Sequence, residues 1–107
     1  MELHCRLYLL GDKPVLEVAG ELDLATLPHL RDQLFKAIDQ HQGATLYVDL
    51  DGITALDDTG LGMLLGGAGR ARQQGGDIML VCTSEQLRSR FALTGLDRAI
   101  EVRQTRD

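Results

Sequence analysis

The amino-acid sequence predicts one α/β domain in which helices pack against a mixed sheet of four to five strands. Two apolar runs joined by a turn open the chain, and three helix-then-strand alternations follow them. Strands joined through helices pair in parallel by right-handed crossovers, so the opening hairpin is the antiparallel part of the sheet. Its 44% apolar and 25% charged residues, in a chain of 107, are typical of a folded globular protein. We therefore expect a single domain over residues 1–107, with a core at about 3–102 and a polar tail at 103–107.

The first half of the chain is expected to form the hairpin and one helix. Residues 3–10 and 15–19 are strand-like, and a Gly/Asp/Pro turn separates them. Pro14 has no N–H to donate to a neighbouring strand, so it belongs at the beginning of the second strand. Apolar residues then recur at helical spacing, with Thr26 as the expected N-cap and an expected end near Gly43.

The second half is expected to alternate strands and helices. Residues 45–50 have little polar interruption, as in a central strand that is covered on both sides. A loop at 51–58 and a helix that ends at Gly75 and Gly76 are expected after it. The remaining elements are a strand at 77–82, a helix that residues 83–86 open in capping-box form and Gly95 stops, and a short strand at 99–102.

Composition and charge exclude several classes of function. Aromatic residues make up only 4% of the chain and the formal net charge is -5, which disfavours base stacking and binding to nucleic acid. No apolar run is long enough to span a membrane, and the first residues do not have the pattern of a secretion signal. We therefore expect a cytoplasmic protein that does not insert into membranes. Cys5 and Cys82 are expected to be reduced thiols that pack as small hydrophobic side chains.

The usual catalytic and cofactor patterns are missing from the sequence. His4, His29 and His41 have no metal-ligand spacing, and none is next to a nucleophile in an elbow motif. The glycines at 66, 67 and 69 are not followed by the lysine and hydroxyl residue of a phosphate-binding loop, and close helix–sheet packing could explain them. We expect no catalytic residue, metal or cofactor, and hence a protein that is not an enzyme.

Thr59 is the centre of the densest local signal, at the point where a strand gives way to a helix. Such loops at the carboxyl ends of strands are common places for functional sites in α/β proteins. One interpretation makes Thr59 only the N-cap of the helix. The other makes its hydroxyl a phosphorylation target, because Gly60 and Gly62 carry no bulky side chains that would hinder a kinase. Phosphate would add about -1.5 to -2 charges beside Asp57 and Asp58 and so change the charge of an exposed patch.

An enzymatic alternative rests on Asp49 and Asp51, which flank one position after an apolar strand. This pattern resembles the first motif of haloacid dehalogenase-type phosphatases, in which one aspartate attacks phosphorus and Mg²⁺ screens the charges. The match fails at Ile53, since Thr54 comes one residue late for that motif. The chain after residue 49 is also too short for the remaining parts of that fold. A Mg²⁺-dependent phosphatase therefore remains a remote alternative.

Five short motifs, taken together and in their order along the chain, resemble those of bacterial anti-sigma factor antagonists, which have the STAS fold. They span nearly the whole chain, from the hairpin to about Val102. They are Gly20-Glu21-Leu22-Asp23, Asp49-Leu50, Leu56-Asp57-Asp58-Thr59-Gly60-Leu61-Gly62, Gly75-Gly76 and Phe91-Ala92-Leu93-Thr94-Gly95-Leu96.

This resemblance implies a function and a set of site residues. Thr59 matches the hydroxyl residue that is phosphorylated by an anti-sigma factor with Ser/Thr kinase activity, and a phosphatase reverses the modification. The unphosphorylated antagonist binds the anti-sigma factor and frees the sigma factor, while ATP and Mg²⁺ belong to the kinase. The resemblance also implies a partner-binding surface, whose expected residues are Asp23, Asp57, Asp58, Gly60, Leu61 and Gly62.

Two features depart from the family pattern. Asp58 stands where a serine is usual, so a permanent negative charge adjoins Thr59. The chain stops soon after Val102, so the final helix of the fold is expected to be short or missing. The main alternative is a STAS module that is not phosphorylated, such as the small cytoplasmic subunit of an ABC-type lipid transporter.

Overall fold

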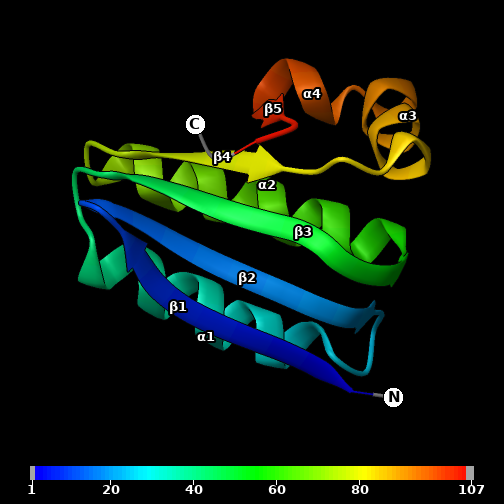
Figure 1. Ribbon diagram of the computed structural model, residues 1–107, viewed down its shortest axis with the longest axis horizontal. Coiled ribbons are helices and arrows are strands. Elements are labelled where there is room, and N and C mark those ends of the chain that lie inside the picture. The colour runs from blue at the N-terminus through cyan, green and yellow to red at the C-terminus, as the bar shows by residue number, and fades with distance from the viewer. Residues whose placement is uncertain (1, 106–107) are drawn as a thin grey trace.

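The computed structural model describes residues 2–105 and has one five-stranded mixed sheet with helices packed on it (Figure 1). The strand order is β1-β2-β3-β4-β5, with β1 antiparallel to β2 and all other neighbours parallel. The elements are β1 (Leu3–Leu10), β2 (Lys13–Leu22), α1 (Leu27–Gln40), β3 (Thr45–Leu56), α2 (Asp58–Gln73), β4 (Asp77–Val81), α3 (Glu85–Thr94), α4 (Leu96–Ala99) and β5 (Glu101–Arg103). The predicted α/β class and the opening hairpin are confirmed.

Most of the core lies between the sheet and its helices. In Figure 1, α1 and α2 lie behind the sheet, while α3 and α4 lie beyond β4. The buried core joins all of these layers, because Leu34 of α1, Leu64 of α2 and Phe91 of α3 belong to one cluster with the inward-facing strand residues. A smaller cluster on the opposite face of the sheet consists of Val15, Tyr47, Met79 and Val81. Alternate residues of the strands thus serve the two faces, as the period of a strand requires.

Small residues in the core agree with the sequence analysis. Cys5 packs against the main core and Cys82 is part of it, and both thiols are free. Burial raises the pKa of the Cys5 thiol to about 11. Gly67 in α2 is needed for close packing, since a Cβ there would lie 2.7 Å from Cδ2 of Leu34, whereas Gly66 has open space.

The strand β3 is longer than predicted. Residues 51–56, expected as part of a loop, continue the strand and pair with the last residues of β2. The pairing passes through register shifts between Glu17 and Ala19 and between Gly20 and Glu21, which are irregularities of the β-bulge type. Residues such as Asp51 and Gly52 therefore remain part of the strand although they are polar or lack a side chain. The prediction that the strand ends at residue 50 is wrong.

The last elements also differ from the prediction. Gly95 ends α3 in a left-handed conformation, with φ 80°, as expected, but a four-residue helix α4 follows directly. The last strand therefore begins at Glu101, two residues later than predicted, and includes Arg103 of the expected polar tail. No helix follows β5 as far as residue 105, and residues 106 and 107 of that tail lie outside the described part of the chain. No helix of the described residues is long and apolar enough to cross a membrane.

Candidate functional site at the start of helix α2

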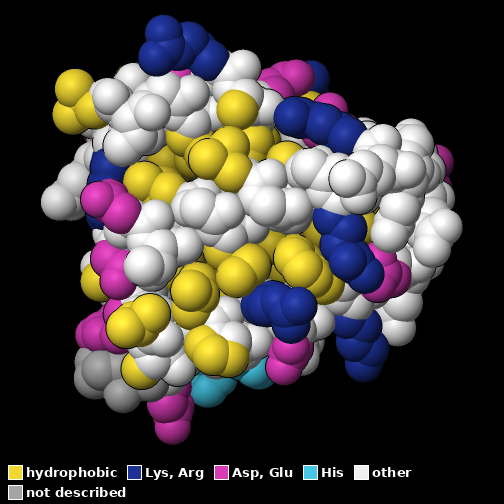
Figure 2. Space-filling model, turned by 180° about the vertical axis from the view of Figure 1, so that it is seen from behind, with side chains coloured by type: hydrophobic (Ala, Val, Ile, Leu, Met, Phe, Trp, Pro, Cys, Tyr) yellow, Lys and Arg dark blue, Asp and Glu magenta, His cyan; other side chains and the backbone are white. Residues whose placement is uncertain are grey.

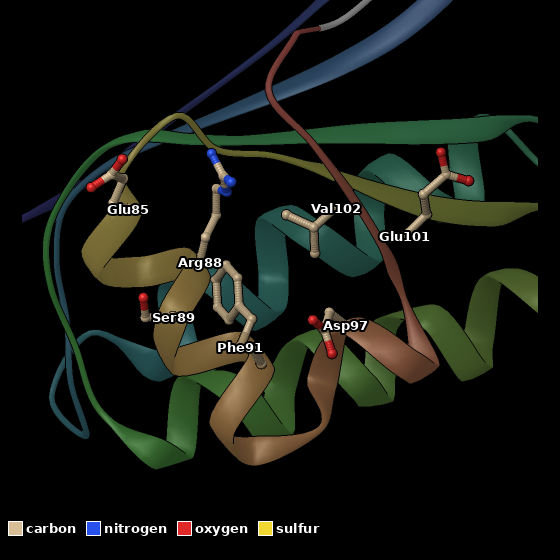
Figure 3. A pocket seen from close by; sticks show the side chains of 8 residues that line it. Glu85, Arg88, Ser89, Phe91, Asp97, Glu101 and Val102 are labelled. Atoms are coloured by element: carbon tan, nitrogen blue, oxygen red, sulfur yellow. The ribbon is translucent and has the colours of Figure 1, made fainter.

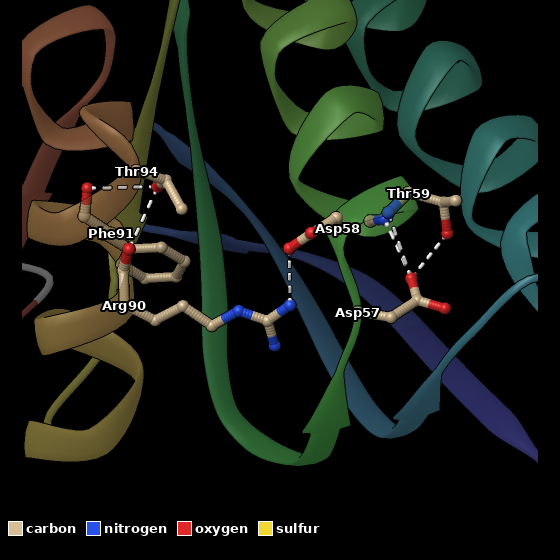
Figure 4. A network of polar contacts seen from close by, with 7 residues as sticks. Asp57, Asp58, Thr59, Arg90, Phe91 and Thr94 are labelled. Atoms are coloured by element: carbon tan, nitrogen blue, oxygen red, sulfur yellow. Dashed lines mark hydrogen bonds and ion pairs between the residues drawn. The ribbon is translucent and has the colours of Figure 1, made fainter.

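Thr59 lies at the beginning of α2, where the chain leaves the long strand β3 (Figure 4). The N-cap of this helix is Asp57, not Thr59 as predicted. A carboxylate oxygen of Asp57 accepts hydrogen bonds from the backbone N–H groups of Thr59 at 3.1 Å and Gly60 at 3.3 Å. The N-cap moves because β3 extends to Leu56, which leaves Asp57 as the extended residue before the first helical turn. Thr59 is thereby free of a capping role.

The Thr59 hydroxyl is exposed and donates to a carboxylate oxygen of Asp57 at 2.5 Å. This hydrogen bond is the main reason that the pKa of Asp57 lies below its ordinary value. The N–H groups of Gly60 and Thr59 and the charge of Arg90 lower it further, while burial acts in the opposite direction. Asp57 is therefore ionised near neutral pH. Its carboxylate both caps the helix and holds the Thr59 hydroxyl.

Asp58 points to the other side of the helix end and pairs with a residue from another element. Its carboxylate accepts a hydrogen bond at 2.7 Å from the guanidinium of Arg90, which reaches across from α3 (Figure 4). The Asp58 side chain is 87% exposed and that of Arg90 is 34% exposed. The sequence analysis did not identify Arg90, and no local pattern could have done so, because the two residues are 32 positions apart.

Asp23 belongs to the same end of the molecule. The backbone N–H of Asp57 donates to the carbonyl oxygen of Leu22 at 3.2 Å, so the end of β2 lies beside the start of α2. The half-buried Asp23 uses one carboxylate oxygen to accept from the N–H groups of Ala25 at 2.9 Å and Thr26 at 3.0 Å. Asp23, Asp57 and Asp58 together form an acidic surface around Thr59.

Of the other predicted partner-binding residues, Gly60 and Leu61 are buried and Gly62 is exposed. A Cβ at Gly60 would lie 2.6 Å from Cδ2 of Leu22 and 2.7 Å from Cδ1 of Leu56. Gly60 therefore allows α2 to pack closely on β2 and β3. Gly62 is exposed with open space around it, so it leaves the surface beside Thr59 accessible.

Asp49 and Asp51, on which the phosphatase alternative depends, lie within β3 and not at its carboxyl end. Asp49 is only 5% exposed, and one of its carboxylate oxygens accepts from the N–H of Asp51 at 2.9 Å. The Asp51 carboxylate accepts from both the N–H and the hydroxyl of Thr83, at 2.7 and 3.0 Å. The Asp51 carboxylate thus connects β3 to the segment after β4, whereas the Asp49 carboxylate holds neighbouring backbone of β3. No group of three possible ligands for a metal ion occurs within residues 2–105. This placement does not fit an aspartyl nucleophile with a bound Mg²⁺.

A hollow of about 650 Å³ lies away from Thr59, between α3, α4 and β5 (Figure 3). Its rim is charged: Glu85 and Arg88 come from α3, Asp97 from α4 and Glu101 from β5. No residue of the acidic surface lines it. The hollow therefore does not belong to the site around Thr59.

Comparison with known proteins agrees with this fold and site. Residues 5–103 match the family model described as "Mlab, STAS domain". An anti-sigma-B factor antagonist of Bacillus subtilis (strain 168) is 36% identical over 85 residues, which cover 79% of this chain and 76% of that protein. These matches place the chain in the STAS-domain family. Within that family it belongs with the anti-sigma factor antagonists, so the resemblance seen in the motifs is confirmed.

Solved structures show the same fold at lower identity. The crystal structure of an anti-sigma factor antagonist from Mycobacterium paratuberculosis has a TM-score of 0.88 at 24% identity, covering 99% of this chain and 89% of that one. The Bacillus cell fate determinant SpoIIAA in its phosphorylated form has a TM-score of 0.68 at 23% identity, covering 92% of this chain and 90% of that one. The predicted STAS fold is thereby confirmed.

Proposed function

We propose that this protein binds an anti-sigma factor and that phosphorylation of Thr59 switches this binding off. The observation that carries the proposal is the exposed Thr59 hydroxyl, which stands at the start of α2 and bonds to a side chain, not to the backbone. The hydroxyl makes no hydrogen bond to a backbone group of residues 2–105, so replacing its proton by a phosphoryl group removes none of the backbone-to-backbone hydrogen bonds of the helix. The modification therefore changes the surface and preserves the fold.

The effect of phosphate on this surface follows from charge and hydrogen bonding. Transfer of the γ-phosphoryl group of ATP to the Thr59 oxygen releases ADP, and the hydroxyl proton passes to a base of the kinase. The ester oxygen has no proton left to donate to Asp57, and about two negative charges are added next to that carboxylate. The start of the helix offsets this repulsion by about 0.3–1 kcal/mol. The net result is a much more negative surface in the same place.

The partner that this proposal requires is an anti-sigma factor with Ser/Thr kinase activity. The kinase supplies ATP and Mg²⁺, and a phosphatase restores the hydroxyl, so the antagonist itself is a substrate and holds neither. Because ATP is the phosphoryl donor, the exchange takes place in the cytoplasm. We assign the contact surface to the acidic surface of Asp23, Asp57 and Asp58 together with Gly62, and the buried Gly60 and Leu61 support it from below.

Exposed hydrophobic side chains lie on the elements that carry this surface. Leu24, directly after Asp23, is 72% exposed, Leu65 on α2 is 42% exposed and Leu93 on α3 is 88% exposed. Figure 2 shows that hydrophobic side chains gather in bands over the helical side of the molecule. Protein interfaces combine such apolar contacts with a charged rim, which supports a protein partner for this end of the molecule.

The proposal is tested by the affinity for the anti-sigma factor of the same organism, measured by titration calorimetry with and without kinase activity. Thr59→Ala should retain binding and make it insensitive to ATP. Thr59→Glu should weaken binding at least tenfold, which corresponds to only about 1.4 kcal/mol. The matched control is Gln42→Glu, which adds the same charge at an exposed position in the turn between α1 and β3 and should change affinity far less.

Equal losses for the two glutamate variants would contradict a specific role of Thr59. Co-purification with an ATPase subunit, together with an unmodified Thr59, would instead support the alternative of a transporter-associated STAS module.

A further inference from the structure

The charged groups around Thr59 are three carboxylates and one guanidinium, and they come from three parts of the fold. Asp58 belongs to α2 and Asp57 is the N-cap of that helix, Asp23 lies in the connection from β2 to α1, and Arg90 belongs to α3. Arg90 is the basic residue that contacts this surface, through its 2.7 Å ion pair with Asp58. The sequence itself has no Lys or Arg between Lys36 and Arg70, so the positive charge has to arrive from a distant segment.

We propose that Arg90 is a positioning residue for the switch: by pairing with Asp58 it cancels the fixed negative charge next to Thr59, so that phosphorylation decides the charge of this surface. The inference rests on the proposed function and deepens it. It assigns to α3 a part in a site whose other residues all lie on α2 or beside it.

The physical argument starts from the position of Asp58. Its carboxylate is 87% exposed and adjoins Thr59 in the chain, where an approaching partner meets it directly. Unpaired, it would give the unphosphorylated protein a fixed negative charge at this place, so that both forms would be negative there. Paired with Arg90 at hydrogen-bond distance, the two side chains have no net charge and act on their neighbours only as a dipole. The position next to Thr59 then has little net charge before phosphorylation, and the phosphate makes it strongly negative.

The charge of Arg90 extends beyond its direct partner. It is the smallest of the contributions that lower the pKa of Asp57, the residue that holds the Thr59 hydroxyl. The guanidinium therefore acts electrostatically on both carboxylates that flank the switch. Because exposed ion pairs add little to stability, local charge and not folding is the property that this pair should control.

The test places phosphothreonine at position 59 of the full chain by genetic encoding and follows the second ionisation of the phosphate by ³¹P NMR. This pKa is near 6 for a free phosphomonoester and reports the charge around the phosphate directly. Arg90→Gln should raise it by about half a pH unit, because a positive charge that favours the dianion is lost. Asp58→Asn should lower it by a similar amount, since a like charge is removed.

The matched control is Arg88→Gln, which removes the same charge from the same helix. Arg88 lines the hollow between α3 and β5 (Figure 3), and none of Asp23, Asp57 and Asp58 lines that hollow. It should leave the phosphate pKa unchanged, and the Arg90→Gln shift should shrink at about 1 M NaCl, where screening is strong. Amide spectra of each variant verify that the fold is retained.

An Arg90→Gln shift no larger than the Arg88→Gln shift would overturn the inference. This outcome is separate from a failure of the proposed function, because the phosphate is installed without a kinase. A kinase that modifies Thr59 while Arg90→Gln leaves the phosphate pKa unchanged would refute the role of Arg90 alone.

Discussion

Helices α1 and α2 begin in similar ways, and the comparison shows what separates a structural threonine from a regulatory one. In each case an aspartate carboxylate accepts two backbone N–H groups: Asp23 in the turn just before α1, and Asp57 in the first turn of α2. Each helix start also contains a threonine, Thr26 or Thr59. Thr26 is only 8% exposed, whereas Thr59 is exposed.

The two hydroxyl groups differ in their partners. The Thr26 hydroxyl donates to the carbonyl oxygen of Glu21 at 2.8 Å and accepts from the N–H of Asp23 at 3.1 Å, so it holds the turn between β2 and α1 together. Although Thr26 occupies the predicted N-cap position, its side chain does not cap the helix. The Thr59 hydroxyl bonds to the Asp57 side chain. A buried hydroxyl that bonds to backbone groups cannot be modified without damage to the fold, whereas an exposed hydroxyl that bonds only to a side chain can.

Removing each hydroxyl in turn tests whether Thr26 is structural and Thr59 is not. Thr26→Val should lower the free energy of unfolding by about 1–3 kcal/mol, because two partly buried backbone groups lose their partner. Thr59→Val should lower it by no more than about 0.5 kcal/mol, as is usual for exposed positions. Urea unfolding of both variants, followed by circular dichroism, measures the difference. Equal losses would show that Thr59 is structural as well.

The glycines of the first turns of α2 provide a second test. Gly60→Ala should destabilise the protein by about 1–2 kcal/mol, because its Cβ meets Leu22 and Leu56 and overpacking exceeds the gain in helix propensity. Gly62→Ala should stabilise it by about 0.5–1 kcal/mol, because it has open space and alanine favours the helix. Thermal unfolding midpoints that move in the same direction for both variants would contradict this assignment of faces.

The smallest expected effect concerns pH and Asp57. Because the pKa of Asp57 is lowered in the folded protein, its contribution to stability is fully present above the ordinary value of 3.8. That contribution is lost as the pH falls through the lower folded-state pKa. Unfolding free energies of wild type and Asp57→Asn, measured between about pH 2 and pH 5, should therefore converge toward the acid end. Asp12→Asn, in the exposed hairpin turn, serves as the control, and a similar convergence for that variant would remove the special role of Asp57.

The fold was largely predictable because its main elements have strong local signals. Within residues 2–105, the apolar runs and helical spacing identified all five strands and three of the four helices. Helix α4 was missed because four residues are too few to show a helical period. The extension of β3 was missed because Asp51 and Gly52 are poor strand formers, and only pairing with β2 holds them in the ladder.

The candidate site was predictable at Thr59 and less so in its surroundings. The motif located the residue, but the N-cap was assigned two positions too late because a hydroxyl and a carboxylate can both cap a helix. The pairing of Asp58 with Arg90 depends on how α3 packs beside α2, so it is a property of the tertiary structure. Burial of Gly60 likewise depends on contacts with β2 and β3.

The central claim is that Thr59 is the regulated residue, and mapping of the phosphorylated position tests it most directly. The purified protein is incubated with the anti-sigma factor kinase, ATP and Mg²⁺, and the modified peptides are fragmented in a mass spectrometer. The account predicts one phosphate, on Thr59, none on Thr26, and no incorporation in Thr59→Ala. Phosphate on another residue, with Thr59 unmodified in the wild-type protein, would contradict it.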